Sequence, residues 1–166
     1  KNMLKIQVSI MRLDAMRDAV IVPSHKGVKA HTWLSPAEVK QITSQCPNDI
    51  AGKRDWIVLG LLLGAGLRRE ELSTLTFDMI KTQPTKDGTR TVLEVRGKGA
   101  KLRVIPIKPI LAQRLNEWKL IAGDGLVARS TIRKSRTRLG KSMSSVAVFQ
   151  LVHQYGAKIV KPTLAP

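Results

Sequence analysis

Two short segments of the chain combine basic side chains with glycines in a way that could act on a phosphate. The first, G-A-G-L-R-R-E-E-L at residues 64–72, places Arg68 and Arg69 at the start of a predicted helix, where backbone amides and guanidinium groups can face an anion together. Glu71 follows Arg68 by three residues, so its carboxylate can hold that guanidinium in a fixed orientation. Arginines held in this way are used in phosphoryl transfer, and simple pairing of both arginines with neighbouring carboxylates is the alternative.

The second segment, V-R-G-K-G-A-K-L-R-V-I-P-I at residues 95–107, places Lys98 between two glycines. Nothing bulky shields this lysine, so the backbone can come close to a phosphate or a groove, and the ammonium group can donate a proton to a leaving oxygen. An ordinary exposed basic turn is the alternative. The segment lacks the G-x-x-x-x-G-K-[ST] spacing of a nucleotide-binding P-loop and lies between strands instead of opening a helix.

The elements that must position these segments are mostly helices. The run Ser35-Pro36-Ala37-Glu38 is a capping box and predicts a helix that ends near Cys46. Apolar periodicity predicts further helices over residues 49–63, 67–75, 109–121 and 144–159, and strands over 91–95 and 102–107 that form a hairpin around residues 97–100. The expected fold class is therefore mainly α with a small antiparallel β-sheet, an α+β fold.

Details of these elements can be predicted as well. We expect Gly64 and Gly66 to break the buried second helix, and Leu67, Leu72 and Leu75 of the next helix to face inward. Residues 123–142 are polar, basic and rich in glycine, which indicates a long exposed loop that orders only on a partner. The last helix carries two neighbouring apolar stripes, one of Val146, Phe149 and Val152 and the other of Val148 and Leu151.

The chain also divides along its length. Residues 1–20 have helical periodicity and are predicted to be the end of a preceding domain, residues 21–33 lack periodicity and are predicted to be a linker, and residues 34–166 form the main domain.

The charge of the chain indicates a polyanionic partner. Its 166 residues include 29 Lys and Arg against 12 Asp and Glu, a net charge of +17. Residues 94–166 hold 15 of the basic residues and only 3 acidic ones, and such a band releases counterions when it neutralises phosphates. Aromatic residues make up only 4%, so duplex backbone binding is favoured over base stacking. The basic residues expected to contact DNA are Arg69, Lys101, Arg103, Arg129, Arg133, Lys134, Arg136 and Arg138.

Other kinds of site find little support. The single cysteine, Cys46, excludes an intramolecular disulfide, and no Cys/His cluster has zinc-ligand spacing, so we expect an intracellular protein without a metal. No segment is apolar for long enough to span a bilayer, and no secretion signal is evident. His153 and Tyr155 stand two residues apart on a helix, which favours packing or exposure over catalysis.

Taken together, the two glycine-flanked segments and the intervening L-T-F-D-M-I resemble the catalytic domain of tyrosine recombinases of the phage-integrase family. Their order, the 30 residues from Arg68 to Lys98 and the preceding L-S-P-A-E-V-K helix all agree with this resemblance. The resemblance implies that Arg68 contacts the scissile phosphate, that Glu71 supports it and that Lys98 protonates the departing 5′ oxygen. It also implies that residues 1–20 are the end of a core-binding domain.

The activity implied by the family is site-specific DNA recombination or integration through a 3′-phosphotyrosyl intermediate, without a cofactor. Its implied partners are double-stranded DNA, further protomers in a tetramer and DNA-bending accessory proteins, in a bacterial or phage-encoded, nucleoid-associated protein of the cytoplasm. The family also needs an H-x-x-R box and a nucleophilic tyrosine, and we expect these beyond Pro166, so these 166 residues should bind DNA without cleaving it. The alternatives are a non-enzymatic basic nucleic-acid-binding module and a type IB topoisomerase.

Overall fold

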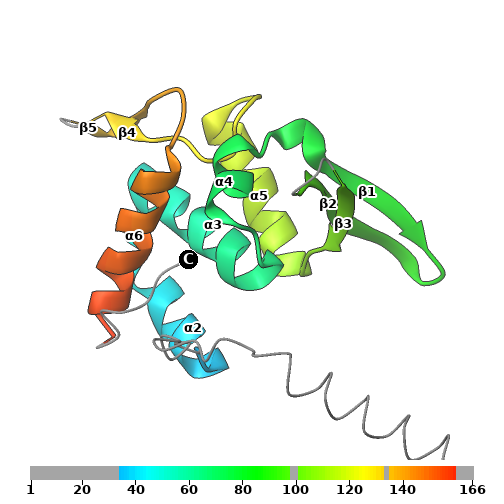
Figure 1. Ribbon diagram of the computed structural model, residues 1–166, viewed down its shortest axis with the longest axis horizontal. Helices are drawn as coiled ribbons and strands as arrows, with labels where there is room; N and C mark the ends of the chain where they lie inside the picture. The colour runs from blue at the N-terminus through cyan, green and yellow to red at the C-terminus, as the bar shows by residue number, and fades with distance from the viewer. Residues whose placement is uncertain (1–33, 98–100, 133–134, 160–166) are drawn as a thin grey trace, which may run out of the picture. The chain divides into compact units, whose positions relative to one another are not determined.

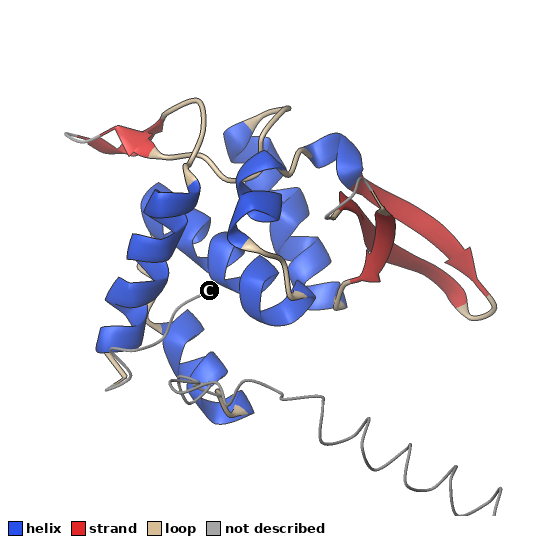
Figure 2. Cartoon of the chain, viewed as in Figure 1, coloured by secondary structure: helices blue, strands red, loops and turns tan. Residues whose placement is uncertain are grey.

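The computed structural model describes residues 34–97, 101–132 and 135–159, all of which belong to the unit that runs from Thr32 to Pro166. Helices form the centre of this unit, and a three-stranded sheet and a short hairpin extend from it (Figures 1 and 2). The mainly helical α+β class is therefore confirmed. The helix predicted over residues 1–20 and the linker over residues 21–33 lie outside the described residues.

The first two described helices begin at side-chain caps. In α2 (Pro36–Ser44), the Ser35 hydroxyl accepts a hydrogen bond from the Glu38 amide at 3.3 Å, and a Glu38 carboxylate oxygen accepts one from the Ser35 amide at 2.7 Å, so the predicted capping box is confirmed. In α3 (Ile50–Ala65), the Asp49 carboxylate accepts a hydrogen bond from the Gly52 amide at 2.7 Å. Helix α3 contacts α2 and three later helices, α4 (Arg69–Thr74), α5 (Pro109–Ala122) and α6 (Ser145–Ala157), so it is buried on several sides, as its apolar sequence predicted.

The end of α3 differs from the prediction in one detail. The helix continues through Gly64 and ends at Gly66, whose φ of 64° is left-handed and therefore suits glycine. The prediction that Gly64 also breaks the helix is wrong, since a glycine inside a helix costs only about 1 kcal/mol. The short helix α4 (Arg69–Thr74) follows, and Leu67, Leu72 and Leu75 are buried around it as expected.

The sheet has one strand more than predicted. After a 3₁₀ turn, η1 (Phe77–Met79), the chain forms β1 (Ile80–Thr85), β2 (Gly88–Arg96) and β3 (Leu102–Pro106), which pair antiparallel in that order. The sequence did contain a signal for β1, because Asp87-Gly88 is a common hairpin turn. The predicted pairing of β2 with β3 is confirmed.

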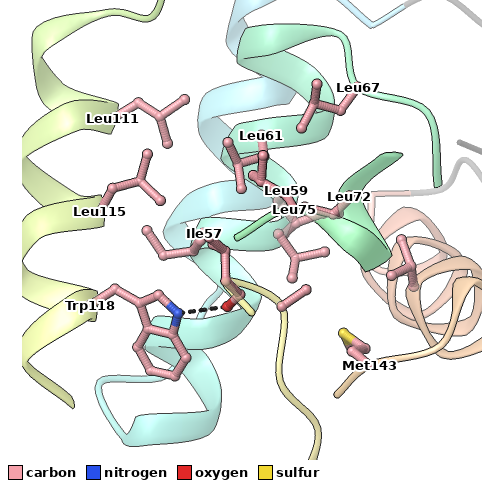
Figure 3. Close-up of a cluster of buried hydrophobic side chains, with 14 of the residues drawn as sticks. Ile57, Leu59, Leu61, Leu67, Leu72, Leu75, Leu111, Leu115, Trp118 and Met143 are labelled. Atoms are coloured by element: carbon pink, nitrogen blue, oxygen red, sulfur yellow. Dashed lines mark hydrogen bonds between the residues drawn. The ribbon is translucent and has the colours of Figure 1, made fainter. Parts of the chain in front are cut away.

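Helix α5 (Pro109–Ala122) closes the apolar core against α3. Leu111, Leu115 and Trp118 of α5 are buried with Ile57 and Leu61 of α3 (Figure 3). The indole nitrogen of Trp118 donates a hydrogen bond to the Val127 carbonyl at 2.9 Å, so this large side chain leaves no buried polar atom unpaired.

Residues 123–142 are not the long exposed loop that their composition predicted. They include the hairpin strands β4 (Thr131–Ile132) and β5 (Ser135–Leu139). Val127 and Ala128 are buried in the core, and the Val127 amide donates to the Leu75 carbonyl at 2.9 Å. The prediction failed because these two apolar residues fix one end of the segment, and the surrounding basic residues hid that signal.

The last helix, α6 (Ser145–Ala157), buries one of its two apolar stripes fully and the other only in part. Val148, Leu151, Val152 and Tyr155 are buried, whereas Val146 is 60% exposed and Phe149 is partly exposed. Of the stripe of Val146, Phe149 and Val152, only Val152 therefore belongs to the core. None of the helices in the described ranges has both the length and the hydropathy of a membrane-spanning segment.

A buried polar contact attaches α6 to α3. The Tyr155 hydroxyl donates to a carboxylate oxygen of Asp55 at 2.9 Å, and Arg54 Nε donates to the other oxygen at 2.5 Å. Burial, together with the negative charge and hydrogen bond of Asp55, raises the pKa of Tyr155, so the phenol stays protonated. The tyrosine therefore has a structural role, in agreement with the packing role expected for it.

We expect Tyr155→Phe to destabilise the chain by about 1–3 kcal/mol, because the buried Asp55 carboxylate loses a donor while the ring still fills its place. Urea unfolding followed by circular dichroism measures this loss. The control is His153→Ala, a change at an exposed position of the same helix, and an equal effect of the two substitutions would contradict the role of the hydrogen bond.

Candidate phosphate-binding site

The connection between α3 and α4 positions Arg68. Gly66 turns the chain at the end of α3, and the next residue, Leu67, is buried and fixes the backbone. Arg68 is then the extended N-cap residue of α4, with φ −76° and ψ 157°. Its backbone amide donates to Oε2 of Glu71 at 2.8 Å, so the carboxylate caps the helix that it belongs to.

The same carboxylate binds two guanidinium groups. Arg68 Nη1 donates to Oε1 of Glu71 at 3.0 Å, which is the pairing expected from their spacing, and Arg103 Nη2 from β3 donates to Oε2 at 2.5 Å. The Glu71 side chain is only 7% exposed, whereas that of Arg68 is 65% exposed. Arg68 is thus held at one nitrogen by a buried acceptor while most of its side chain faces solvent.

These contacts decide the protonation state of Glu71. Burial alone would raise its pKa, but hydrogen bonds from the Arg68 backbone and side chain, with the charges of Arg103 and Arg68, together lower the pKa below its ordinary value. The carboxylate is therefore ionised at neutral pH and leaves the cluster with one net positive charge, which is available to an anion.

Of the second predicted segment, residues 95–107, the structure describes the two strand ends at the base of the hairpin but not residues 98–100. The Gly97 amide donates to the Lys101 carbonyl at 2.9 Å where β2 and β3 meet their connection, and Lys101 is exposed. Lys98 lies outside the described residues, so its position relative to Arg68 stays a prediction. A Cβ atom at Gly97 would lie 3.8 Å from Oε1 of Glu71, so the base of this hairpin is close to the arginine cluster.

The other basic residues predicted to contact DNA fall into different environments. Arg69 is partly exposed, with its guanidinium carbon 5.7 Å from the centre of the Phe149 ring and Nη2 3.8 Å from Glu70. Arg138 is exposed on β5, and Arg136 belongs to the same strand. Arg133 and Lys134 lie outside the described residues.

Arg129 is held inside the chain. Its Nε donates to the Gly140 carbonyl at 2.7 Å, and its Nη1 donates to the Ala122 carbonyl, so both contacts are with backbone of its own fold. These contacts stabilise the base of the β4–β5 hairpin, and a contact of Arg129 with DNA stays a prediction. Arg103 is also not a plain surface cation, since it bonds Glu71. No sequence signal joins Arg103 to Glu71, because 32 residues separate them.

Among the described residues, the remaining candidate groups do not form a second reactive site. Cys46 is partly buried, and burial is the main cause that raises the pKa of its thiol, so it is a poor nucleophile at neutral pH. Within the described ranges no three His, Cys, Asp or Glu side chains come together as metal ligands would. The arrangement at Arg68 can therefore bind and orient a phosphate through fixed cationic donors.

The lowered pKa of Glu71 predicts a pH-dependent contribution to stability. This contribution is present above the ordinary glutamate pKa of about 4.3 and is lost as the pH falls through the lower folded-state value. At neutral pH we expect Glu71→Gln to destabilise the chain by about 1–3 kcal/mol, with a difference from wild type that shrinks below about pH 4.

Urea unfolding at a series of pH values measures this difference. Glu70→Gln is the matched control, because its side chain is 69% exposed and approaches Arg69 only at 3.8 Å. A Glu71→Gln difference that stays constant down to about pH 3 would contradict the ionised, arginine-bound carboxylate.

Comparison with known proteins identifies the family of the chain. The model of the phage integrase family matches residues 32–162. Tyrosine recombinase XerA of Thermococcus kodakarensis is 35% identical over 126 residues, covering 75% of this chain and 41% of that protein. Tyrosine recombinase XerC of Pseudomonas entomophila is 30% identical over 124 residues, covering 72% of this chain and 37% of that protein. The chain thus spans about two fifths of the length of these curated relatives.

Solved structures show the same fold. A crystal structure of XerA recombinase aligns with 83% of this chain and 47% of that one, with a TM-score of 0.58 and 16% identity. XerH site-specific recombinase bound to palindromic difH substrate, in a post-cleavage complex, aligns with 82% of this chain and 38% of that one, with a TM-score of 0.61 and 16% identity. Because the family model covers most of the chain, this chain belongs to the phage integrase family.

Proposed function

We propose that this chain is the phosphate-binding part of a tyrosine recombinase that performs site-specific DNA recombination or integration. The observation that supports this most directly is the Arg68 guanidinium, held by the buried Glu71 carboxylate and otherwise facing solvent. A cation fixed before the substrate arrives can stabilise the charge that develops on a phosphate during strand exchange without reorganising. The sequence relatives named tyrosine recombinases support the same reaction class.

In this proposal the residues have separate roles. Arg68 contacts a non-bridging oxygen of the scissile phosphate, Glu71 orients Arg68, and Lys98 protonates the 5′ oxygen as it leaves. A tyrosine hydroxyl gives up its proton to the surroundings and attacks phosphorus to form a 3′-phosphotyrosyl bond, while the bond between phosphorus and the 5′ oxygen breaks and that oxygen takes the proton of Lys98. A 5′ hydroxyl of another strand then reverses the step. Tyr155 is not that nucleophile, because its hydroxyl is buried against Asp55.

The partner that we propose is double-stranded DNA. The XerH structures, which share this fold, contain XerH bound to its difH substrate. The excess of basic residues in the second half of the chain is the physical basis for this proposal, since phosphate neutralisation dominates affinity for duplexes. On DNA we expect a tetramer of protomers and DNA-bending accessory proteins, in a nucleoid-associated cytoplasmic protein.

Two other functions are less well supported. A non-enzymatic binding module needs positive charge but has no need of a buried carboxylate that orients one arginine. A type IB topoisomerase would use similar chemistry, and the relatives found are recombinases. Relaxation of supercoiled DNA without a defined pair of sites would favour the topoisomerase.

We expect Arg68→Ala to separate cleavage from binding. In the protein as encoded, with whatever residues flank this chain, the rate of covalent adduct formation on a nicked duplex should fall by at least about 100-fold, as for loss of one transition-state donor. Duplex affinity should fall only about three- to tenfold, because many cations share that binding. Alanine keeps the backbone amide that donates to Glu71 Oε2, so the cap of α4 is retained.

Denaturing gel electrophoresis measures the adduct, and fluorescence anisotropy measures affinity. The control is Lys40→Ala, an equal loss of charge at an exposed position of α2. Adduct formation at the wild-type rate by Arg68→Ala would show that the assignment of Arg68 is wrong.

The two arginines of the β4–β5 region should respond differently to substitution. Arg138→Gln is expected to lower the slope of log affinity against log salt concentration by about one while stability stays unchanged, as for loss of a phosphate contact. Arg129→Gln is expected to lower the free energy of unfolding by about 1–3 kcal/mol, because the Gly140 and Ala122 carbonyls lose a donor. Salt titrations and urea unfolding of both variants test this, and the opposite pattern would overturn the assignments.

A further inference from the structure

Arg103 lies on the inner face of the sheet. Side chains alternate between the two faces of a strand, and along β3 Leu102 and Val104 are exposed whereas Arg103 and Ile105 are partly buried. Arg103 is opposite Val95 of β2, which is buried in the core. The strand therefore directs Arg103 toward α4 and away from the exposed face of the sheet.

At α4 this arginine meets a carboxylate that already serves Arg68. Arg103 Nη2 is 2.5 Å from Oε2 of Glu71, the oxygen that also accepts the Arg68 amide, while Oε1 holds Arg68 Nη1 at 3.0 Å. Both oxygens are thus occupied, and the carboxylate group has little freedom to rotate. If Arg103 were absent, only bonds from Arg68 itself would hold Oε1 and Oε2.

The contact of Arg103 with Glu71 stabilises the fold less than a simple ion pair with all donors bonded would. Two guanidinium groups share one carboxylate, so they repel each other, and Arg103 Nε is buried without an acceptor among the described residues. A buried donor without a partner is destabilising. The contact does provide orientation. Because the Glu71 carboxylate is bonded from both α4 and β3, it holds the Arg68 guanidinium in a fixed direction.

We propose that Arg103 is a positioning residue for Arg68, holding the Glu71 carboxylate in the orientation that presents the Arg68 guanidinium to a phosphate. The proposal deepens the proposed function and depends on it for the role of Arg68. It replaces the expectation that Arg103 contacts DNA directly. The Arg103 side chain then also fixes the position of the base of the β2–β3 hairpin relative to the start of α4.

The first test observes Arg68 directly. In a ¹⁵N-edited NMR spectrum of the 166-residue chain, a held guanidinium gives separate Nη signals because its rotation about the Nε–Cζ bond is slow. The signals that disappear in Arg68→Lys are assigned to Arg68. Arg103→Gln should merge these signals, and Arg103→Lys, which keeps one charged donor, should restore part of the separation. The control is Arg90→Gln, because Arg90 is an exposed arginine of the same sheet whose contact is with Gln83 at 3.5 Å.

Unchanged Arg68 signals in Arg103→Gln would overturn the proposal. If Arg103→Gln does not fold, Arg103→Lys decides in its place: reduced separation of the Arg68 signals supports the proposal, and full separation contradicts it.

The second test is a double-mutant cycle on duplex binding, measured by fluorescence anisotropy with the same 166-residue chain. Arg103→Gln should weaken binding about three- to tenfold in the wild-type background and less than about twofold when Arg68 is already alanine. Equal effects in both backgrounds would mean that Arg103 contacts phosphate itself, and the positioning role would be wrong. If Arg68→Ala leaves affinity unchanged, the role proposed for Arg68 in DNA binding fails, and the NMR result still decides whether Arg103 positions it.

Discussion

The Glu71 carboxylate receives hydrogen bonds from the Arg68 amide, the Arg68 guanidinium and the Arg103 guanidinium while only 7% of its side chain is exposed. One buried negative charge therefore caps α4, orients a solvent-facing arginine and joins that helix to the sheet. Desolvation opposes this ionised state, and the three donors outweigh it, as the direction of the pKa shift indicates. Without the charge, the solvent-facing Arg68 guanidinium would lose its fixed orientation.

The helical core supplies the rigidity that this interaction needs. The left-handed turn at Gly66 and the buried Leu67 fix where α4 begins, and Leu72 holds its other side against the core. Behind them, α3 packs against α5 and against α6, where the Tyr155 hydroxyl meets Asp55. A site that must hold charged groups at set distances works best when supported in this way by packed secondary structure.

Local patterns in the sequence predicted the features that depend on neighbouring residues. Each of these features depends on residues that are close together in the sequence or on a repeating apolar pattern. They are the capping box at Ser35, the buried α3, the β2–β3 pairing and the bond between Arg68 and Glu71. The role of Arg103 and the contact of Tyr155 with Asp55 could not be predicted, because they join residues 32 and 100 positions apart. The hairpin within residues 123–142 was missed for a related reason, since the buried Val127 that anchors it gains its contacts from distant elements.

We propose that Glu71 presents Arg68 to a DNA phosphate, and a crystal structure of this chain bound to a short DNA duplex would show whether it does. We expect a phosphate oxygen within hydrogen-bond distance of the Arg68 guanidinium, with both Glu71 oxygens still bonded to Arg68 and Arg103. A duplex bound on another face, with Arg68 left in solvent, would show that Arg68 does not bind the phosphate.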